Sequence, residues 1–258
     1  MQFKDQIGNI ISLPITPKRI VSLVPSQTEL LIDLGLKENL VGITKFCVHP
    51  KNLRKEIKVV GGTKSLHFDK VEAVKPDLII CNKEENTKEM VVELQKIAPV
   101  WVSDIFSIDD SLEMIKRIGS MCGVEDIATS ICSKIISEKE DFLNFVKDKP
   151  TKKVVYVIWK KPLMIAGKNT FINELLVLNN FENSYEDESS RYPEVKKDFL
   201  KQADEILLST EPFPFKEKDA IALSKELDKK VSIVDGEYFS WYGSRLIEAF
   251  SYFKSLHS

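Results

Sequence analysis

Short runs of β-branched and other apolar residues recur along the chain, and each is followed by a stretch with helical spacing. Such runs, alternating with helices, are typical of parallel strands that are covered on both faces of a sheet. The alternation therefore predicts the α/β class, with parallel-rich central sheets. The runs are RIVSLV (19–24), LVGIT (40–44), DLIIC (77–81), PVWVS (99–103), VVYVIW (154–159), EILLS (205–209) and VSIVD (231–235).

A longer helical pattern separates the earlier runs from the later ones. In EDIATSICSKIISEKEDFLNFVKDKP (125–150), apolar residues recur at helical spacing until Pro150 ends the pattern. A helix of this length can join two lobes, although an ordinary crossover helix on the surface is the alternative. We expect an N-terminal lobe over residues 1–122, a connecting helix over 123–150 and a C-terminal lobe over 151–258.

A weak internal similarity supports two Rossmann-like lobes. FDKVEAVKPDLII (68–80) resembles KKDFLKQADEILL (196–208), since in each an acidic residue opens a short helix that leads to an apolar strand. Two α/β lobes that face each other leave a cleft, and clefts between lobes are preferred ligand sites.

Composition and charge exclude several classes of protein. With 258 residues, 43% of them hydrophobic, the chain can bury a substantial core. Its 37 basic and 39 acidic residues are spread evenly, which predicts no field that would gather nucleic acid or an anionic membrane. No apolar run approaches the roughly 20 residues that span a bilayer. The N-terminal residues show no export pattern, so a cytoplasmic location is expected if this is the full precursor.

Cysteine and histidine usage gives little material for catalysis. The four cysteines form no C-x-x-C pair and are expected to be buried thiols rather than a disulfide framework. The sequence has no G-x-S-x-G elbow, P-loop or G-x-G-x-x-G motif, and it has only 3 histidines. An enzyme is therefore not expected.

The most informative stretch is RIVSLVPSQTELLIDLGLKENLVGIT (19–44). Pro25 is expected to end the strand, and Ser26 with Glu29 to form a capping box that opens the next helix. This arrangement would place Gln27 and Thr28 beyond the end of the strand.

This stretch resembles the opening of the ABC-importer substrate-binding proteins for vitamin B12, haem and ferric siderophores. The family pattern, a strand followed by P-S-x-T-E and a helix ending in L-G, is matched by residues 25–35. VVGG (59–62), VEAVKPDLII (71–80) and SRYPEV (190–195) follow in the family's order. The resemblance runs from about residue 17 to the C-terminus and is closest to the B12-binding members.

The resemblance implies two lobes joined by one long helix, and a non-enzymatic protein that captures a metal chelate between them. The ligand would be a corrinoid, haem or ferric siderophore that is delivered to an ABC permease. No intrinsic cofactor is implied, and we expect a monomer. The resemblance places such a protein in the periplasm or cell envelope.

In the family the ligand is held mainly by aromatic side chains on loops after the strands. By resemblance, Phe46 stands where a B12 binder has a pocket tyrosine, and Tyr192 where it has a tryptophan. Asn82 follows DLIIC in a loop where an aromatic residue is expected, and Trp159 ends VVYVIW. Both are candidate ligand contacts.

The segment DGEYFSWYGSR (235–245) gathers further candidates. Because Gly236 and Gly243 flank it, we expect a loop that presents Glu237, Tyr238 and Trp241 to the ligand, although a core-packing corner is the alternative. Arg245 would meet a ligand carboxylate or phosphate, or else form a salt bridge with Glu237.

A second hypothesis rests on KFCVHP (45–50). Cys47 and His49, with His67 on the next loop and Glu237 or Glu211 from the other lobe, are chemically suitable metal ligands. The protein would then be a cytosolic metal or metallocofactor chaperone or sensor. The alternative is that Cys47 is a buried thiol and His49 a loop residue at the rim of a pocket.

Two acidic residues are candidates for permease docking. By resemblance, Asp69 and Asp198 stand at the outward-facing start of a helix, where the family presents one carboxylate per lobe to permease arginines. Negative charge is favoured at a helix N-terminus in any case, so a local role is the alternative.

Overall fold

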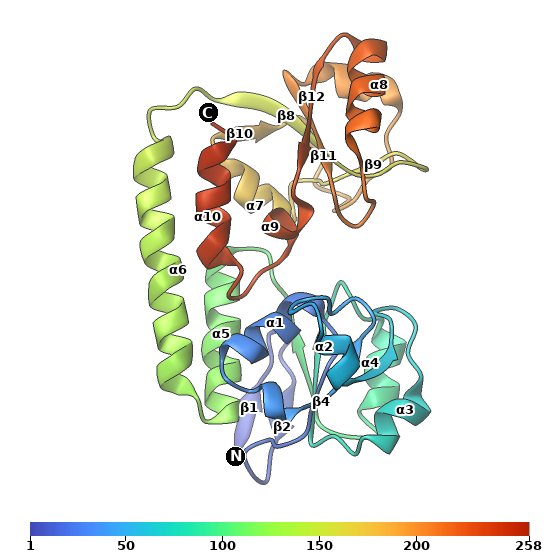
Figure 1. Cartoon of the computed structure of the whole chain (residues 1–258), viewed down its shortest axis with the longest axis vertical. Helices are drawn as coiled ribbons and strands as arrows, with labels where there is room; N and C mark the ends of the chain where they lie inside the picture. Colours follow the sequence, from blue (N-terminus) through green and yellow to red (C-terminus); the bar gives the residue numbers. More distant parts are fainter. Residues whose placement is uncertain (258) are drawn as a thin grey trace. The chain divides into compact units, whose positions relative to one another are not determined.

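The computed structural model describes residues 1–257, and its contacts group the chain into two compact units (Figure 1). Unit 1 comprises residues 1–105, 109–135 and 242–245. Unit 2 comprises residues 106–108, residues 136–241 and the described residues from 246 onward. Each unit contains one five-stranded sheet in which parallel pairs predominate, so the predicted α/β class is confirmed.

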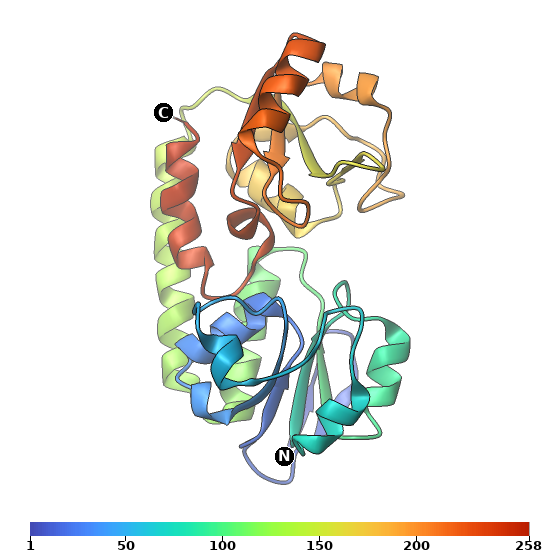
Figure 2. The ribbon, with the colours of Figure 1, turned by 45° about the vertical axis from the view of Figure 1, so that its right-hand side comes forward.

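In unit 1 the five-stranded sheet is entirely parallel, with the strand order β5-β4-β3-β6-β7. A separate antiparallel hairpin, β1 with β2, precedes it. Figures 1 and 2 show α1 and α5 on one face of the sheet and α3 and α4 on the other. The elements are β1 (Gln2–Lys4), β2 (Ile10–Ser12), β3 (Ile20–Ser22), α1 (Pro25–Asp33), the 3-10 helix η1 (Lys37–Asn39), β4 (Leu40–Thr44), α2 (Leu53–Glu56), β5 (Lys58–Gly61), α3 (Phe68–Ala73), β6 (Leu78–Asn82), α4 (Lys88–Leu94), β7 (Val100–Ser103) and α5 (Ile108–Cys122).

The apolar runs of the sequence form the interior of this sheet. Strand β4 has the predicted bounds, and β3, β6 and β7 differ from theirs by one to three residues. Side chains such as Val21, Ile79 and Val102 are buried in one core cluster. Because both faces of a parallel sheet are covered, nearly every residue of these strands is buried.

The predicted capping box at Ser26 and Glu29 is wrong. Helix α1 begins at Pro25, its N-cap is Val24, and no side chain caps it. Proline suits the first helical position because that position needs no N–H donor. The helix therefore starts one residue before Ser26, which lies inside the first turn, and Glu29 has a different partner.

In unit 2 the strand order is β10-β8-β11-β12, all parallel, and β9 pairs antiparallel with β8. Figures 1 and 2 show α7, α9 and α10 on one side of these strands and α8 on the other. The elements are β8 (Lys152–Trp159), β9 (Met164–Ile165), α7 (Phe171–Leu178), β10 (Phe181–Asn183), the 3-10 helix η2 (Lys197–Gln202), β11 (Glu205–Ser209), α8 (Glu217–Leu227), β12 (Lys230–Val234), α9 (Gly236–Ser240) and α10 (Leu246–Ser255).

The predicted long helix is present as α6 (Glu125–Val146), with 22 residues. Unit 1 contains it up to Ile135 and unit 2 from Ile136, so the contacts divide this helix between the units. Among residues 1–257, no helix combines the length and the apolar character needed to cross a membrane.

An aromatic cluster joins α6 to α10 within unit 2, where the two helices run side by side (Figures 1 and 2). The Phe142 ring is fully buried and lies 5.8 Å from Phe250 and 5.9 Å from Phe253 between ring centroids. At the edge of the cluster Asp141 and Lys254 form an ion pair. The second half of α6 is therefore a core element of unit 2.

Replacing Phe142 with alanine is expected to lower the free energy of unfolding by roughly 3–5 kcal/mol, because the truncation leaves a cavity among packed rings. Phe145, one turn along the same helix and 37% exposed, supplies the matched control. We expect Phe145→Ala to cost about 1 kcal/mol. Chemical denaturation monitored by circular dichroism measures both, and equal losses would contradict the assignment of Phe142 to the core.

Candidate functional site

Four strands of the unit 1 sheet end in a buried polar residue. These residues are Ser22 of β3, Thr44 of β4, Asn82 of β6 and Ser103 of β7. The carboxyl ends of parallel strands lie at one edge of a sheet, which is where ligands bind in open α/β folds. The polar residues form the base from which the loops of this edge depart.

One hydrogen-bonded group fixes the loop after β4. The Thr28 hydroxyl of α1 donates to Ser22 Oγ at 2.8 Å, and its Oγ1 lies 3.1 Å from the Cys47 Sγ. That sulfur also lies 3.3 Å from Thr44 Oγ1. Cys47 is 1% exposed, and burial raises the pKa of its thiol. Cys47 is therefore a protonated, buried thiol that anchors the loop.

A second group fixes the loop after β6. The Asn82 side chain donates to Ser103 Oγ at 3.0 Å and accepts from the backbone N–H of Glu84 at 2.8 Å. Gln27 of α1 also donates to Ser103 Oγ, and its Nε2 lies 3.4 Å from the Tyr242 hydroxyl. Asn82 is 2% exposed, and its hydrogen bonds shape its own loop. A ligand contact by Asn82 stays a prediction.

Phe46 lies on the surface of unit 1, between the buried side chains of Thr44 and Cys47. The ring is 48% exposed, and the Lys45 Nζ lies 5.0 Å from its centroid. The Phe46 backbone N–H donates to Thr44 Oγ1 at 3.3 Å. The loop thus presents an aromatic face next to a positive charge. The hydrogen bonds of the buried Thr44 and Cys47 side chains hold the loop in place.

The structure does not assemble the metal site that Cys47, His49 and His67 suggested. Within residues 1–257, no three His, Cys, Asp or Glu side chains are grouped so that they could hold a metal ion. His67 is the N-cap residue of α3, and its N–H donates to the Val60 carbonyl at 2.9 Å. His49 is half-buried and electrostatically coupled to Glu29.

Arg245 forms a bidentate ion pair with Glu29. Its Nη2 lies 2.6 Å from Glu29 Oε1, and its Nε lies 2.8 Å from Oε2. The side chains are only 9% and 19% exposed. Burial raises the pKa of the Glu29 carboxyl, whereas the hydrogen bonds and charge of Arg245 lower it. The geometry matches the planar fork that arginine offers to carboxylates.

In unit 2 the strand β8 ends at Trp159, which is 38% exposed. The Trp159 indole donates to the Lys161 carbonyl at 3.0 Å and meets the Phe213 ring edge to face at 5.6 Å. Arg191 covers the Phe106 ring, with 4.3 Å from its Cζ to the centroid, and Phe106 is 38% exposed. Tyr192, next to Arg191, is half-buried.

The segment 235–245 is only in part the loop that the glycines predicted, since residues 241–245 belong to no helix or strand but residues 236–240 are helical. Gly236 opens helix α9, and Asp235 caps it by accepting from the Glu237 N–H at 3.0 Å. A Cβ at Gly236 would come within 2.6 Å of the Glu211 nitrogen, so glycine is needed for close packing rather than for flexibility. The loop prediction is therefore wrong for residues 236–240.

The aromatic residues of this segment are largely inside the protein. Phe239 is fully buried against Tyr156, with 5.1 Å between ring centroids, and Trp241 is 7% exposed. The Trp241 indole donates to Glu211 Oε2 at 3.1 Å. Tyr238 is half-buried and stacks on Tyr252 at 4.8 Å. Ligand contacts by Tyr238, Trp241 and Glu237 stay predictions.

Sequence reasoning missed three contributors at these strand ends: Lys45, Phe106 and Arg191. Phe106 comes three residues after the end of β7, and this position was the available signal. Arg191 adjoins Tyr192, but its contact with Phe106 joins residues far apart in the sequence and left no local signal.

The sequence matches the model of the family described as "Periplasmic binding protein" over residues 20–213. The match spans most of the chain, and the chain belongs to this family of substrate-binding proteins.

Relatives and a solved structure agree with this assignment. The chain is 27% identical to an uncharacterized ABC transporter substrate-binding lipoprotein, YvrC, of Bacillus subtilis, over 95% of this chain and 81% of the relative. It is 22% identical to the vitamin B12-binding protein of Salmonella choleraesuis, over 76% of this chain and 74% of that protein. A periplasmic haem-binding protein of Pseudomonas aeruginosa has the same fold, with a TM-score of 0.82 and 21% identity, over 93% of this chain and 92% of that one.

Replacing Arg245 with methionine is expected to lower the free energy of unfolding by roughly 3 kcal/mol, because Glu29 would be left without its buried partner. Arg117 of α5 is half-buried and pairs at 2.6 Å with the exposed Glu113, and it provides the control. We expect Arg117→Met to cost at most about 1 kcal/mol. Urea denaturation of both variants compares them, and a negligible effect of Arg245→Met would show that the pair does not stabilise the fold.

Proposed function

We propose that this protein captures a metal-chelate nutrient and presents it to an ABC importer at the cell envelope, without catalysing a reaction. The chelate would be a corrinoid, haem or ferric siderophore. The observation that carries the proposal is that each unit presents an exposed aromatic ring beside a cation: Phe46 with Lys45 in unit 1, and Phe106 with Arg191 in unit 2.

The chemistry of these pairs suits a flat chelate with acidic substituents. A macrocycle gains contact energy by stacking on aromatic faces. A neighbouring lysine or arginine can pair with a carboxylate or phosphate on the same ligand. The named ligands of two similar proteins, vitamin B12 and haem, are flat metal macrocycles, which supports this ligand class. The family and the lipoprotein relative support an importer partner and an envelope location.

The alternative of a metal or metallocofactor chaperone has weaker support. A cysteine binds metal as the thiolate, but burial raises the pKa of Cys47 and its sulfur contacts two threonine hydroxyls. His49 and Cys47 also lack a third ligand of the usual kind within the described residues. Accordingly, we assign the segment KFCVHP (45–50) the role of holding the Phe46 ring at the surface, rather than that of supplying metal ligands.

Titration of the purified protein with cobalamin, cobinamide, haem and ferric siderophores, followed by tryptophan fluorescence with inner-filter controls, is expected to show saturable quenching by one chelate. Phe46→Ala should weaken its binding about tenfold, the loss of one aromatic contact of about 1.4 kcal/mol. Phe145→Ala removes an exposed ring from α6 and should leave affinity unchanged. Binding of bare zinc or iron with no chelate response would instead favour the chaperone.

We further propose that Asp69 and Asp198 dock the permease. Asp69 is exposed in the first turn of α3. Asp198 lies in the first turn of η2, and its side chain is 87% exposed although it pairs with Lys201 at 2.9 Å. An exposed pair of this kind holds its partners weakly, so Asp198 is available to a cationic partner.

Reversing both charges, with Asp69→Lys and Asp198→Lys, should reduce chelate transport at least tenfold in cells that carry the cognate importer, roughly the effect of losing two interfacial charge contacts. Chelate affinity measured on the purified variant should not change. Glu140→Lys with Asp148→Lys, an equal charge change at exposed positions, serves as the control. Full transport by the docking variant would leave both aspartates as residues of local helix starts only.

A further inference from the structure

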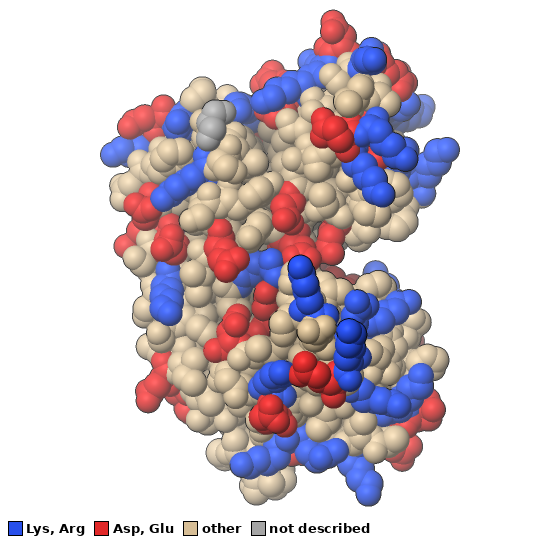
Figure 3. Space-filling model, in the orientation of Figure 1, with Lys and Arg blue, Asp and Glu red and all other residues tan. Residues whose placement is uncertain are grey.

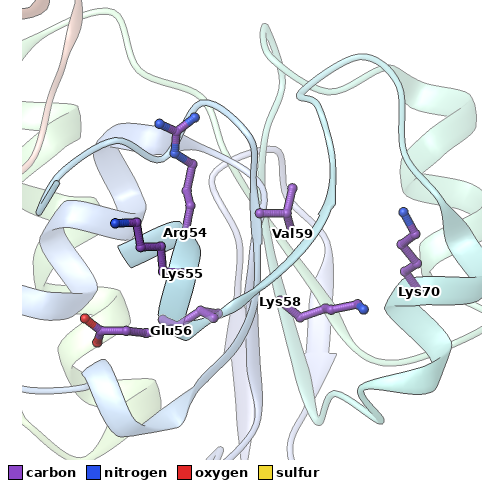
Figure 4. A pocket seen from close by; sticks show the side chains of 7 residues that line it. Arg54, Lys55, Glu56, Lys58, Val59 and Lys70 are labelled. Atoms are coloured by element: carbon purple, nitrogen blue, oxygen red, sulfur yellow. The ribbon is translucent and has the colours of Figure 1, made fainter. Parts of the chain in front are cut away.

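Unit 1 has a hollow beside its edge strand β5, and none of the candidate ligand residues lines it. The hollow has a volume of about 540 Å³. Figure 4 shows its lining side chains on α2 and the start of β5 on one side and on α3 on the other. Lys58 opens β5 and its amino group extends toward α3, which carries Lys70 (Figure 4). The candidate ligand residues follow the opposite, carboxyl ends of the strands. The lining residues are Arg54, Lys55, Glu56, Ile57, Lys58, Val59 and Lys70.

The cations that line this hollow have no ion-pair partner among the described residues. Among residues 1–257, no carboxylate forms an ion pair with Arg54, Lys55, Lys58 or Lys70. Glu56, the one acidic lining residue, pairs with Lys37 at 2.7 Å. Four cations therefore remain in a chain whose formal net charge is only −2.

The arrangement of these cations indicates the kind of partner. Arg54 is oriented by a hydrogen bond from its Nη1 to the Lys45 carbonyl at 2.9 Å. The three lysines carry mobile point charges rather than rigid forks, and Lys55 and Lys58 are exposed. Figure 3 shows Lys and Arg side chains gathered over the part of unit 1 that carries α2. An open group of flexible cations fits an extended array of anions better than one enclosed small anion.

We propose that this basic hollow, defined by Arg54, Lys55, Lys58 and Lys70, binds the phosphate headgroups of anionic phospholipids at a membrane surface. Each lysine or arginine near such a surface strengthens binding roughly fivefold, and the attraction falls off within a Debye length. The contact would hold unit 1 against the bilayer in which an importer resides. The sequence-averaged charge predicted no such attraction, and the fold creates it by bringing residues 54–58 beside residue 70.

Co-sedimentation of the purified chain with vesicles tests the proposal. Vesicles containing equal parts of phosphatidylglycerol and phosphatidylcholine should bind the protein, whereas pure phosphatidylcholine vesicles should not. Binding should fall as ionic strength rises from roughly 0.05 M to roughly 0.5 M, since the Debye length shortens. Changing all four cations to glutamine should weaken the partition coefficient by roughly 600-fold, and the Lys55→Gln, Lys58→Gln pair by roughly 25-fold.

The control changes four exposed lysines elsewhere that form no ion pair within residues 1–257, with Lys134, Lys161, Lys218 and Lys225 each replaced by glutamine. This variant has the same net charge as the test variant and should bind vesicles like the unchanged protein. Equal losses in the two variants would overturn the proposal, because net charge alone would then explain binding. Calorimetric binding of inorganic phosphate that depends on the four cations, without vesicle binding, would also overturn it and assign the hollow to a small anion.

Discussion

The loops at the strand ends of unit 1 depend on hydrogen bonds between side chains that are buried beneath them. A buried hydroxyl or amide without a partner costs about 1–3 kcal/mol, so the positions of these groups are closely constrained. Thr28, Thr44 and Cys47 satisfy one another in this way under the loop that follows β4. Phe46 lies between two of these anchored residues, and its exposure follows from their burial. The buried polar side chains at the end of β4 thus determine that the Phe46 ring is the apolar group that remains exposed.

Burial also explains why the strands could be predicted from the sequence better than the segments that connect them. The runs LVGIT and EILLS coincide with β4 and β11 because a strand buried on both faces needs a continuous apolar run. The sequence allowed α1 to begin either at Pro25 or after Ser26 as the N-cap residue, and in the structure the helix begins at Pro25. At Gly236 the sequence suggested flexibility, but the residue is glycine because Glu211 packs against its backbone.

The candidate site was predictable in its residue types but not in its pairings. The aromatic character of Phe46 and Trp159, and their places after strands, could be read directly. The partner of Arg245 is Glu29, 216 residues earlier, and no local pattern links them. Likewise, Phe106 acquires its cation from Arg191. Such contacts are set by the packing of distant elements, and a single sequence shows only each partner alone.

The burial of all four cysteines has a practical consequence for studying this protein. Cys47, Cys81, Cys122 and Cys132 are free thiols inside the fold, and burial raises the pKa of each. Maleimides and iodoacetamides react with exposed thiolates, so the native chain offers them little to attack. A single cysteine added on the surface could therefore be labelled with a fluorophore without removing any native residue. With one such label, the fluorescence of the protein could report ligand binding directly.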